Sequence, residues 1–152
     1  MLDIKEVLLE ENVCLDLEAS TKDEVIEEMC DMLSRNGCIS DKGTFIKEIY
    51  NREAEGLTGI GDGIAIPHGR NQCVQRTVIA FGRTKADIDW GSYDEQPVHC
   101  IIMFAVRDVD MSQHIILLSH VAQLLLDKNV IEMLGKASNA EEVVNILRKE
   151  GE

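Results

Sequence analysis

The residue best placed for chemistry is His68, which follows Pro67 inside a glycine-rich segment, Leu57–Arg70. Four glycines fall within the eleven residues from Gly59 to Gly69, a density typical of a backbone that needs unusual dihedral angles. Neutral imidazole is nucleophilic near pH 7, and successive N–H groups in such a turn can bind an anion. The segment therefore predicts a reactive histidine beside an anion, although a purely structural turn explains the glycines equally well.

Two arginines lie close to this histidine in sequence and could neutralise a phosphoryl group. Arg70 is two residues further on, but its side chain could point away. Arg52 lies near the end of the helix predicted before the glycine segment, where position alone favours a simpler role as a base that complements the helix dipole. Phosphoryl transfer needs mainly positioning and charge stabilisation, so a histidine, free N–H groups and one cation would suffice.

The other histidines offer weaker sites. His114 falls in the first turn of a predicted helix, where the positive end of the helix dipole favours an anion. His120 lies on a different face of the same helix, and His99 lies in an apolar strand, as a hydrogen-bonded core or edge residue would. There is no H-E-x-x-H motif and no Cys/His spacing of the zinc type. We therefore predict neither a metal nor a cofactor.

Other catalytic classes fit poorly. The glycine segment does not contain G-x-x-x-x-G-K-[ST], and Gly59-x-Gly61-x-Gly63 lacks the dinucleotide-binding pattern. The five cysteines form no C-x-x-C pair, and neither Cys73 nor Cys100 has an identifiable base partner. Scattered cysteines of this kind are typical of reduced core thiols, so we expect a cytoplasmic protein.

Helices must position these residues from two parts of the chain. In the first half, Thr21–Glu24 has the form of a capping box and opens a helix that stops at Gly37. A second helix is predicted from about residue 41 to 55, with Phe45 and Ile49 pointing inward. In the second half, apolar spacing predicts a long helix from Ser112 to Asp127, a short helix over 130–136, and a last helix. The long helix would point Ile115, Leu118, Ala122 and Leu125 inward and end near Asn129; the last would start at a capping box, Ser138–Glu141, with Val144 and Leu147 inward.

Four strands are predicted, one before the first of these helices and three between the helices of the two halves, and they define the fold class. They are Val13–Leu17, Ile64–Ile66, Thr77–Arg83 and Val98–Val106, and the last is apolar enough to be central in a sheet. The reactive histidine would then lie at the end of the short strand Ile64–Ile66. Helices and strands alternate, so the class is α/β, or α+β if the sheet is mixed.

Composition narrows the range of functions. The 152 residues correspond to one domain, and 28 acids against 15 bases give a net charge of −13, which repels nucleic acid. No apolar run is long enough to span a bilayer, and the N-terminus lacks the basic and apolar regions of a secretory signal. We therefore expect a single soluble domain that neither binds nucleic acid nor inserts into a membrane.

The chemistry-bearing segment resembles a known family. Arg52-Glu53 followed by Thr58-Gly59-Ile60-Gly61-Asp62-Gly63-Ile64-Ala65-Ile66-Pro67-His68-Gly69 is similar to the signature of EIIA domains of the fructose/mannitol class. These domains belong to the bacterial phosphoenolpyruvate-dependent sugar phosphotransferase system (PTS). The likeness extends to His114 and the C-terminal helices, so residues 1–152 are expected to form one EIIA type-2 domain.

This resemblance implies a fold, a reaction and a set of site residues. The fold would be an α/β sandwich with a mixed central sheet flanked by helices. His68 would be the phosphorylated residue, Arg52 and His114 would steady the phosphate beside it, and Thr58, Gly59 and Gly69 would belong to the phosphate-binding loop. His114 would donate a hydrogen bond or hold the His68 ring in the right tautomer. The site would be shallow and partly apolar.

The resemblance also implies partners. The phosphoryl donor would be the carrier protein HPr, and the acceptor would be a cysteine of EIIB, which phosphorylates sugar during transport through the membrane component EIIC. The segment from Ile88 to Val98 looks closer to the fructose type than to the mannitol type, while Arg107 and Asp62 depart from the residues frequent there. A stand-alone subunit for uptake of fructose or a related sugar is therefore expected.

Two alternatives within the same fold stay open. A nitrogen-type regulatory EIIA protein would use the same chemistry to control other proteins. A non-catalytic EIIA-like binding domain would keep the fold and never become phosphorylated. Phosphorylation assays and neighbouring EIIB and EIIC genes would separate these cases.

Overall fold

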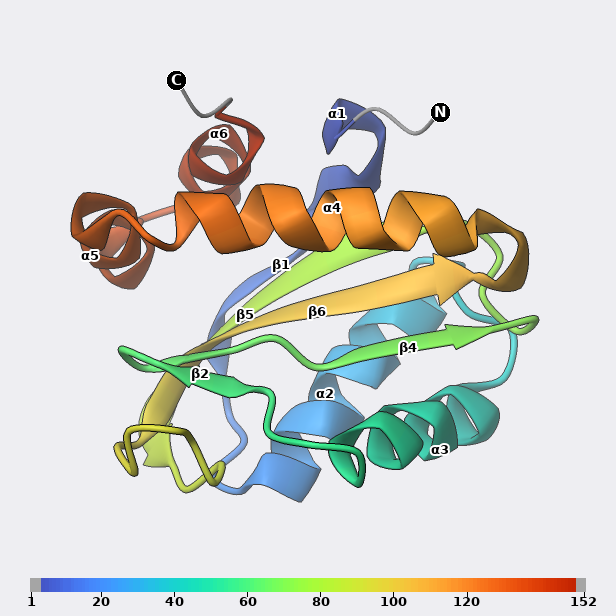
Figure 1. The fold of residues 1–152 in the computed structure, drawn as a ribbon, viewed down its shortest axis with the longest axis horizontal. Coiled ribbons are helices and arrows are strands. Elements are labelled where there is room, and N and C mark those ends of the chain that lie inside the picture. Colours follow the sequence, from blue (N-terminus) through green and yellow to red (C-terminus); the bar gives the residue numbers. More distant parts are fainter. Residues whose placement is uncertain (1–3, 150–152) are drawn as a thin grey trace.

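The computed structural model describes residues 4–149, which form a mixed six-stranded β-sheet with helices on both faces (Figure 1). In chain order the elements are α1 (Ile4–Val7), β1 (Leu8–Leu17), α2 (Lys22–Arg35), α3 (Lys42–Glu53), β2 (Gly59–Gly61), β3 (Ile64–Ala65), β4 (His68–Asn71), β5 (Val78–Ile88), β6 (Val98–Arg107), the 3₁₀ turn η1 (Asp108–Asp110), α4 (Met111–Leu124), α5 (Lys128–Lys136) and α6 (Ala140–Arg148). The predicted α/β sandwich with a mixed central sheet is confirmed.

The strand β6 lies inside the sheet, as its apolar sequence predicts. The strand order is β1-β5-β6-β3-β2, and β4 also pairs with β6. β5 runs antiparallel to β6, whereas β3 and β4 both run parallel to it, one after the other along the same edge. The chain leaves this edge only at Ile66–Pro67, between β3 and β4. That short interruption comes directly before His68.

Two hydrophobic cores lie on the two faces of the sheet. Side chains of β6 alternate between them because successive residues of a strand point to opposite faces. Cys100, Ile102, Phe104 and Val106 join the core under α4, α5 and α6, whereas Ile101, Met103 and Ala105 join the core under α2 and α3. Figure 1 shows α4 crossing one side of the sheet while α2 and α3 lie on the other. Both faces are covered, which explains why β6 is apolar along almost its whole length.

Of the two predicted helix caps, the one at Thr21 is confirmed and the one at the last helix is shifted. Thr21 caps α2 by accepting the N–H of Glu24, and Asp41 caps α3 by accepting the N–H of Thr44. Glu24 completes its box by accepting from the Ser20 backbone instead of the Thr21 backbone. The predicted cap of the last helix is wrong by one residue. Asn139, not Ser138, caps α6, because the Asn139 side chain accepts the N–H of Glu142 while Ser138 donates its own N–H to the Glu142 carboxylate.

The inward face of the long helix also differs from the prediction. α4 ends at Leu124 and α5 already begins at Lys128, so Asn129 lies inside α5 rather than ending a helix. The buried stripe of α4 is Leu117, Val121 and Leu124, whereas Ile115 is 69% exposed and Ala122 is also exposed. Of the predicted inward residues, only Leu125, the C-cap, is buried, and Leu118 is half-buried. Apolar residues occur around most of this helix, so spacing alone could not select the buried face.

Three strand predictions are corrected in length or position. The strand predicted at Val13–Leu17 begins at Leu8, and the one predicted at Thr77–Arg83 continues to Ile88. Trp90 follows that strand in a loop and is buried. His68 does not end the short strand at Ile64–Ala65; it begins the next one, β4. The structure describes no helix, within residues 4–149, that is both long and apolar enough to cross a membrane. One pair, Asp108–Leu124 and Lys128–Lys136, meets that length and composition only when joined across a bend of 92°.

Candidate functional site

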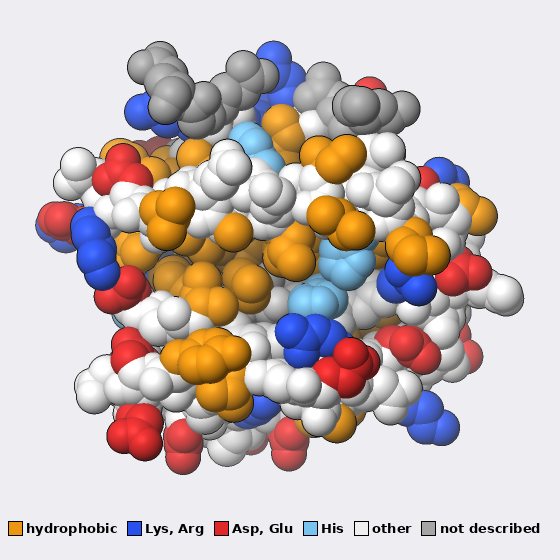
Figure 2. Space-filling model, viewed as in Figure 1, with side chains coloured by type: hydrophobic (Ala, Val, Ile, Leu, Met, Phe, Trp, Pro, Cys, Tyr) orange, Lys and Arg blue, Asp and Glu red, His pale blue; other side chains and the backbone are white. Residues whose placement is uncertain are grey.

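Three separate elements bring the predicted site residues together. Arg52 lies in the last turn of α3, His68 is the first residue of β4, and His114 lies in the first turn of α4. β4 pairs with β6, whose end leads through η1 into α4, and the first turn of α4 places His114 beside the start of β4, where the two histidine rings meet. Figure 2 shows histidine side chains at the surface below α4, beside basic side chains and next to a hollow with hydrophobic walls. The expected partly apolar surface is therefore present.

The two nitrogens of the His68 ring have different partners. Nδ1 lies 3.1 Å from the carbonyl oxygen of Ile66, and a carbonyl can only accept, so Nδ1 carries the hydrogen. Nε2 is then unprotonated, and it accepts a hydrogen bond of 3.1 Å from Nε of Arg52. The main chain of Ile66 thus selects the tautomer, a task that the sequence assigned to His114 as one option. The lone pair that could act as a nucleophile is the one on Nε2.

The environment keeps the His68 ring neutral. Burial is the largest cause that lowers its pKa below the ordinary value of 6.5, and the positive charge of Arg52 lowers it further. The hydrogen bond to Ile66 acts in the opposite direction. His68 as a whole is 9% exposed, so most of the residue is covered while part of it reaches solvent. A neutral ring with a free lone pair is the nucleophilic form of histidine.

The side chain of Arg52 is held at both ends of its guanidinium group. Its Nε donates to His68, and its Nη1 donates to the carbonyl oxygen of Gly56 at 3.2 Å. The second contact is the kind expected of a base near a helix C-terminus, while the first is not. One contact therefore supports Arg52 as a base at the helix end, and the other supports it as a partner of His68. Only the contact with His68 involves a group that can react.

His114 stands edge-on to His68. The two ring centroids are 5.0 Å apart with an interplanar angle of 71°, and Phe104 lies 6.3 Å from His114 on another side. Nε2 of His114 is buried and has no hydrogen-bond partner among the residues that the structure describes. Burial is the largest cause that lowers the pKa of His114 to about 4, and electrostatic repulsion from His68, Arg70 and Arg52 lowers it further. In the tautomer that carries its hydrogen on Nε2, the neutral His114 ring could donate this N–H to an oxygen atom bound beside His68.

The residues predicted for a phosphate loop are packed into the protein. Thr58 is 2% exposed, and its hydroxyl donates to the carboxylate of Glu53 while it accepts from Nε1 of Trp90. A side chain at Gly59 would meet the Cα of Ser92 at 2.9 Å. Gly69 lies in β4, paired with Ala105, and a side chain there would meet Phe45 at 3.1 Å. Close packing alone therefore explains why glycine occupies positions 59 and 69.

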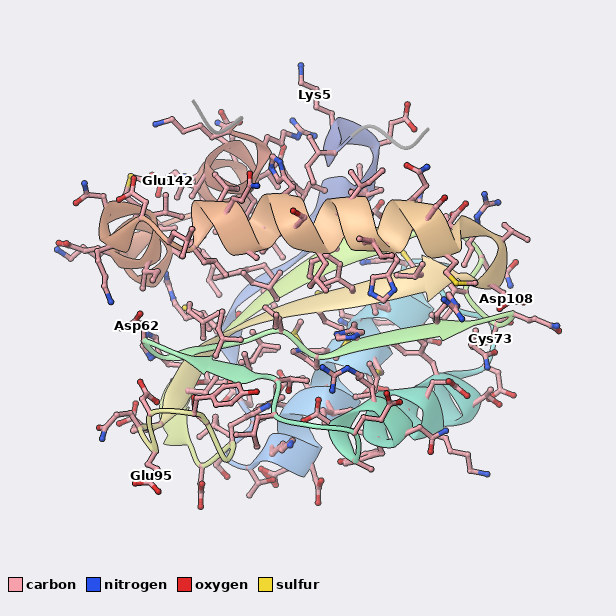
Figure 3. The ribbon with its side chains drawn as sticks, viewed as in Figure 1. Lys5, Asp62, Cys73, Glu95, Asp108 and Glu142 are labelled. Carbon is pink, nitrogen blue, oxygen red and sulfur yellow. The ribbon has the colours of Figure 1, made fainter. Side chains whose placement is uncertain are left out.

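The segment around the site is more regular than the glycine count suggests. Gly61 and Gly63 have positive φ angles of 101° and 79° and shape the turn between β2 and β3, whose strands pair antiparallel. Asp62, one of the departures from the family pattern, lies at the tip of this turn, and Figure 3 shows it at the far end of the sheet edge from Asp108. Lys128 pairs with Asp62 at 2.9 Å. This departure is therefore remote from the histidine pair.

The second departure, Arg107, lies at the start of the turn that leads to His114. Its guanidinium binds both carboxylate oxygens of Asp110, and its N–H donates to the hydroxyl of Thr77, which itself donates to Asp110. Arg70 faces Asp108 of the same turn at 3.9 Å. These contacts tie η1, which leads into α4, to β4 and to the residue before β5. A proline at this position would stiffen the chain, whereas Arg107 holds the turn through its ion pair with Asp110.

The remaining histidines and cysteines lie outside this site. His99 is half-buried against the backbone of Gly63, and Nε2 of His120 lies 3.0 Å from the carbonyl oxygen of Leu147. Among residues 4–149 no group of three or more His, Cys, Asp or Glu side chains is arranged to hold a metal ion. Burial raises the pKa of Cys73, and it raises that of Cys100 to about 11. Neither thiol is poised to ionise at neutral pH.

Sequence reasoning missed two participants. The carbonyl of Ile66 selects the His68 tautomer, and no sequence signal marks a backbone group for such a role. Glu53 was noted only as the neighbour of Arg52 in the family signature, yet its carboxylate binds Lys22 at 2.6 Å and Thr58 at 2.7 Å. An acid directly after the arginine of the family signature is the sequence signal that could have pointed to it.

Solved structures that resemble this chain include IIA proteins. The nitrogen regulatory protein IIA-Ntr from Neisseria meningitidis superposes with a TM-score of 0.87 at 34% identity, over 95% of this chain and 98% of its own. The enzyme IIAMtl from Escherichia coli, solved in a complex with phosphorylated enzyme IIBMtl, gives a TM-score of 0.77 at 26% identity, over 92% of this chain and 96% of its own. Fold and site together therefore define a domain of the IIA class.

The sequence comparison identifies the family. Residues 6–150 match the family described as phosphoenolpyruvate-dependent sugar phosphotransferase system, EIIA 2, and the chain belongs to this family. The fructose-specific EIIABC component of Bacillus subtilis (strain 168) is 34% identical over 97% of this chain, which spans only 23% of that relative's length. The fructose-specific EIIA component of Haloferax volcanii is 29% identical over 95% of this chain and 94% of its own. The resemblance drawn from the histidine segment is confirmed.

Proposed function

We propose that this chain is a phosphohistidine carrier of the sugar phosphotransferase system, which takes a phosphoryl group from phospho-HPr on Nε2 of His68 and passes it to a cysteine of EIIB. The observation that carries the proposal is the hydrogen-bond pattern of the His68 ring: Nδ1–H donates to Ile66, and the free Nε2 faces Arg52 at 3.1 Å. The fructose-specific names of two relatives support uptake of fructose or a related sugar. The solved complex of IIAMtl with phosphorylated IIBMtl supports EIIB as the acceptor.

The residues present account for each step of the transfer. Nε2 of His68 attacks the phosphorus in line, so a new N–P bond forms while the bond to the donor nitrogen of HPr breaks and leaves its electron pair there. The guanidinium of Arg52 moves from Nε2 to the oxygens of the transferred group. Nε2 of His114, which lacks a partner, donates to another of these oxygens. Transfer to EIIB reverses the sequence, with a thiolate as the attacking group.

The apolar surroundings suit exchange between proteins. Met111 and Ile115, on the same helix as His114, are 55% and 69% exposed, and Val109 before them is more exposed still. Residues of this kind around a reactive group are typical of a surface that partner proteins cover during transfer. We place the function in the cytoplasm, where HPr and EIIB would reach the site, with EIIC as an indirect partner and residues 1–152 acting as one EIIA domain.

Labelling from phosphoenolpyruvate tests the proposal. With enzyme I and HPr, the wild-type chain should take up one acid-labile, base-stable phosphate, and His68→Ala should take up none. His99→Ala, which changes a half-buried histidine outside the site, serves as the matched control and should label normally. Acid-labile phosphate on the His68→Ala chain would refute the assignment, and an unlabelled wild-type chain would indicate a non-catalytic binding domain.

A second candidate is a nitrogen-type regulatory protein that uses the same chemistry. The match to IIA-Ntr from Neisseria meningitidis, with a TM-score of 0.87 at 34% identity, favours it. Both candidates predict phosphorylation of His68, so the next step separates them. Label that moves from the phosphorylated chain to the cysteine of a candidate EIIB supports transport, whereas a labelled chain that no EIIB discharges supports regulation.

A further inference from the structure

The contacts around the site form a closed ring that includes both reacting-site side chains. Arg52 donates to His68 at 3.1 Å, and His68 donates through Nδ1 to Ile66 at 3.1 Å. Ile66 donates its N–H to the carbonyl of Thr58 at 2.9 Å, and the Thr58 hydroxyl donates to the carboxylate of Glu53. Glu53 follows Arg52 in the chain, which completes the ring. Every member therefore influences the distance between the guanidinium and the imidazole.

The Glu53 carboxylate is the anchor of this ring. Its side chain is only 7% exposed, and both of its oxygens lie within 2.9 Å of the Thr58 hydroxyl. Lys22 contacts Oε1 at 2.6 Å and lies 5.0 Å from the ring centroid of Trp90, which donates its N–H to the same hydroxyl. The hydroxyl is thus fully used, as donor to Glu53 and as acceptor from Trp90. No donor remains on the Thr58 side chain for a phosphate.

Only the carboxylate of this ion pair is buried, because the Lys22 side chain is 27% exposed and that of Glu53 is 7% exposed. Removing a carboxylate from water costs free energy that its contacts must recover, so an apolar side chain would suit a position that served stability alone. The carboxylate also sits at the last residue of α3, directly after Arg52, where a helix end would otherwise fray. Its contacts hold that end against the strand segment that leads to His68.

We propose that Glu53, acting through the Thr58 hydroxyl, is a positioning residue that holds the Arg52 guanidinium and the His68 ring at the distance and orientation needed for phosphoryl transfer. The inference rests on the proposed function and deepens it. Glu53 touches neither the histidine nor the phosphoryl group. Its effect comes from geometry, because displacements of about 1 Å in a reacting pair can cost on the order of a hundredfold in rate. Thr58 then belongs to the support of the site instead of to its phosphate contacts.

The test compares variants that differ by one hydroxyl. Thr58→Val keeps a similar shape and removes the bond to Glu53, Thr58→Ser keeps the hydroxyl, and Glu53→Gln keeps an acceptor but removes the charge. Thr84→Val is the matched control, because Thr84 is also a buried threonine whose hydroxyl donates to a carbonyl, that of Ala86, outside the ring. Two readouts are needed: the single-turnover rate from phospho-HPr at saturating donor, and the ring ¹⁵N chemical shifts of His68 in the unphosphorylated protein.

We expect the variants to disturb the alignment of Arg52 and His68 without weakening the binding of the donor, phospho-HPr. Thr58→Val should lower the saturating rate about tenfold or more, with little change in the donor concentration needed for half the maximal rate. Its His68 ¹⁵N shifts should move away from the Nδ1–H tautomer, and Glu53→Gln should change in the same direction. Thr58→Ser should restore both readouts, and Thr84→Val should leave both unchanged.

Several results would overturn the inference. One is a folded Thr58→Val variant whose rate and ¹⁵N shifts change no more than those of Thr84→Val. Another is a folded Thr58→Ser variant that fails to recover either readout, since the hydroxyl would then not be what matters. If the wild-type chain takes no phosphate, the proposed function fails, but the ¹⁵N shifts still decide: unchanged shifts in Thr58→Val and Glu53→Gln refute the positioning role, and moved shifts support it.

Discussion

At the scale of single residues, the site keeps two imidazole rings uncharged in a protein whose net charge is −13. A field of that sign would by itself favour protonated histidines, yet the pKa of His68 is lowered and that of His114 falls to about 4. Burial is the largest cause for both rings, and the nearby charge of Arg52 adds to it. Short-range desolvation outweighs the surface charge because water and salt screen distant acids.

Replacing Arg52 should slow phosphorylation without unfolding the protein. One charge-assisted hydrogen bond contributes about 1.5–3 kcal/mol, so Arg52→Ala should lower the labelling rate roughly ten- to a hundredfold or more. Arg52→Lys should recover part of the loss, because lysine restores the charge but not the planar group. The measurement is the rate from phospho-HPr, with Arg76→Ala as control at an exposed arginine outside the site. An unchanged rate would leave Arg52 only its contact with the helix end.

The low pKa of His114 predicts how stability depends on pH. The unfolded chain binds a proton at His114 near the ordinary pKa of 6.5, whereas the folded protein binds it only near 4. Between these values the unfolded state holds more protons, so the free energy of unfolding decreases as pH falls, by at most about 1.4 kcal/mol per unit from this ring. His68 adds a decrease of the same sign. Urea unfolding at several pH values should show a shallower dependence for His114→Gln; an equal slope would contradict the assignment.

Phosphorylation should reverse the shift at His114. A phosphoryl group on Nε2 of His68 would place negative charge beside the unpaired Nε2 of His114, and an opposite charge favours the protonated ring. The pKa of His114, followed by NMR of its ring protons, should therefore rise when His68 is phosphorylated. The control is His120, whose Nε2 already contacts the Leu147 carbonyl and whose ring-proton signals at a fixed pH should be the same in both states. A His114 pKa that stays near 4 would place the phosphoryl group elsewhere.

At the scale of elements, the position of His68 follows from a break in one sheet edge. β3 and β4 both pair with β6 in the same direction, and the two residues Ile66–Pro67 separate them. The carbonyl of Pro67 still accepts the N–H of Phe104, so the break does not release the strand from the sheet. The carbonyl of Ile66 is left to bind the histidine ring. A continuous strand would have used that carbonyl in the sheet ladder.

The turn before this break gives a prediction about stability. Gly63 has a φ of 79°, and a Cβ there would lie 2.2 Å from a ring carbon of His99. Gly63→Ala combines an unfavourable backbone with a steric clash, so it should destabilise the fold by roughly 2–4 kcal/mol. Gly91→Ala is the matched control, because Gly91 has a φ of 82° and open space around it, and should cost about 1–2 kcal/mol.

Thermal or urea unfolding measures both glycine variants. Adding His99→Ala to Gly63→Ala should recover the steric part of the loss and leave the backbone part. Equal losses for Gly63→Ala and Gly91→Ala would show that the His99 ring yields to the added methyl group at no cost.

At the scale of the whole molecule, the surface carries a large excess of negative charge while the interior is apolar. The acids outnumber the bases by 28 to 15, and the two cores on either side of the sheet contain almost only apolar side chains. Acids cluster at the surface of α2, where Glu27 and Asp31 share the single cation of Lys42. Like charges on a folded surface repel one another, which lowers the stability of the compact state. The arginines around His68 make the site a local exception.

The net charge predicts a response to salt. Raising NaCl from about 20 mM to about 500 mM shortens the screening length from roughly 20 Å to a few ångströms. Self-repulsion should weaken more than the isolated surface ion pairs, so the free energy of unfolding should increase on the order of 1 kcal/mol. Urea unfolding at both salt concentrations measures the change. Glu27→Gln with Asp31→Asn should reduce the response to salt, and a stability that falls with NaCl would show that the ion pairs matter more.

Local sequence determined much of this protein. The capping residue Thr21, the inward Phe45 and Ile49, the central apolar strand and the α/β class all follow from the spacing and type of neighbouring residues. The histidine segment was recognisable for the same reason, since its glycines, proline and histidine are contiguous. Chemistry that depends on adjacent residues can be read along the chain.

The tertiary structure alone decided which groups meet. The inward face of α4 went to Leu117, Val121 and Leu124 because the sheet covers that side, while apolar residues elsewhere on the helix stayed exposed. The bond from Arg52 to His68 joins different elements, and Glu53 forms an ion pair with Lys22, far earlier in the chain. Such contacts depend on where the chain returns after folding. Residue spacing specifies local conformation, but distances between separate elements arise only when the core packs them together.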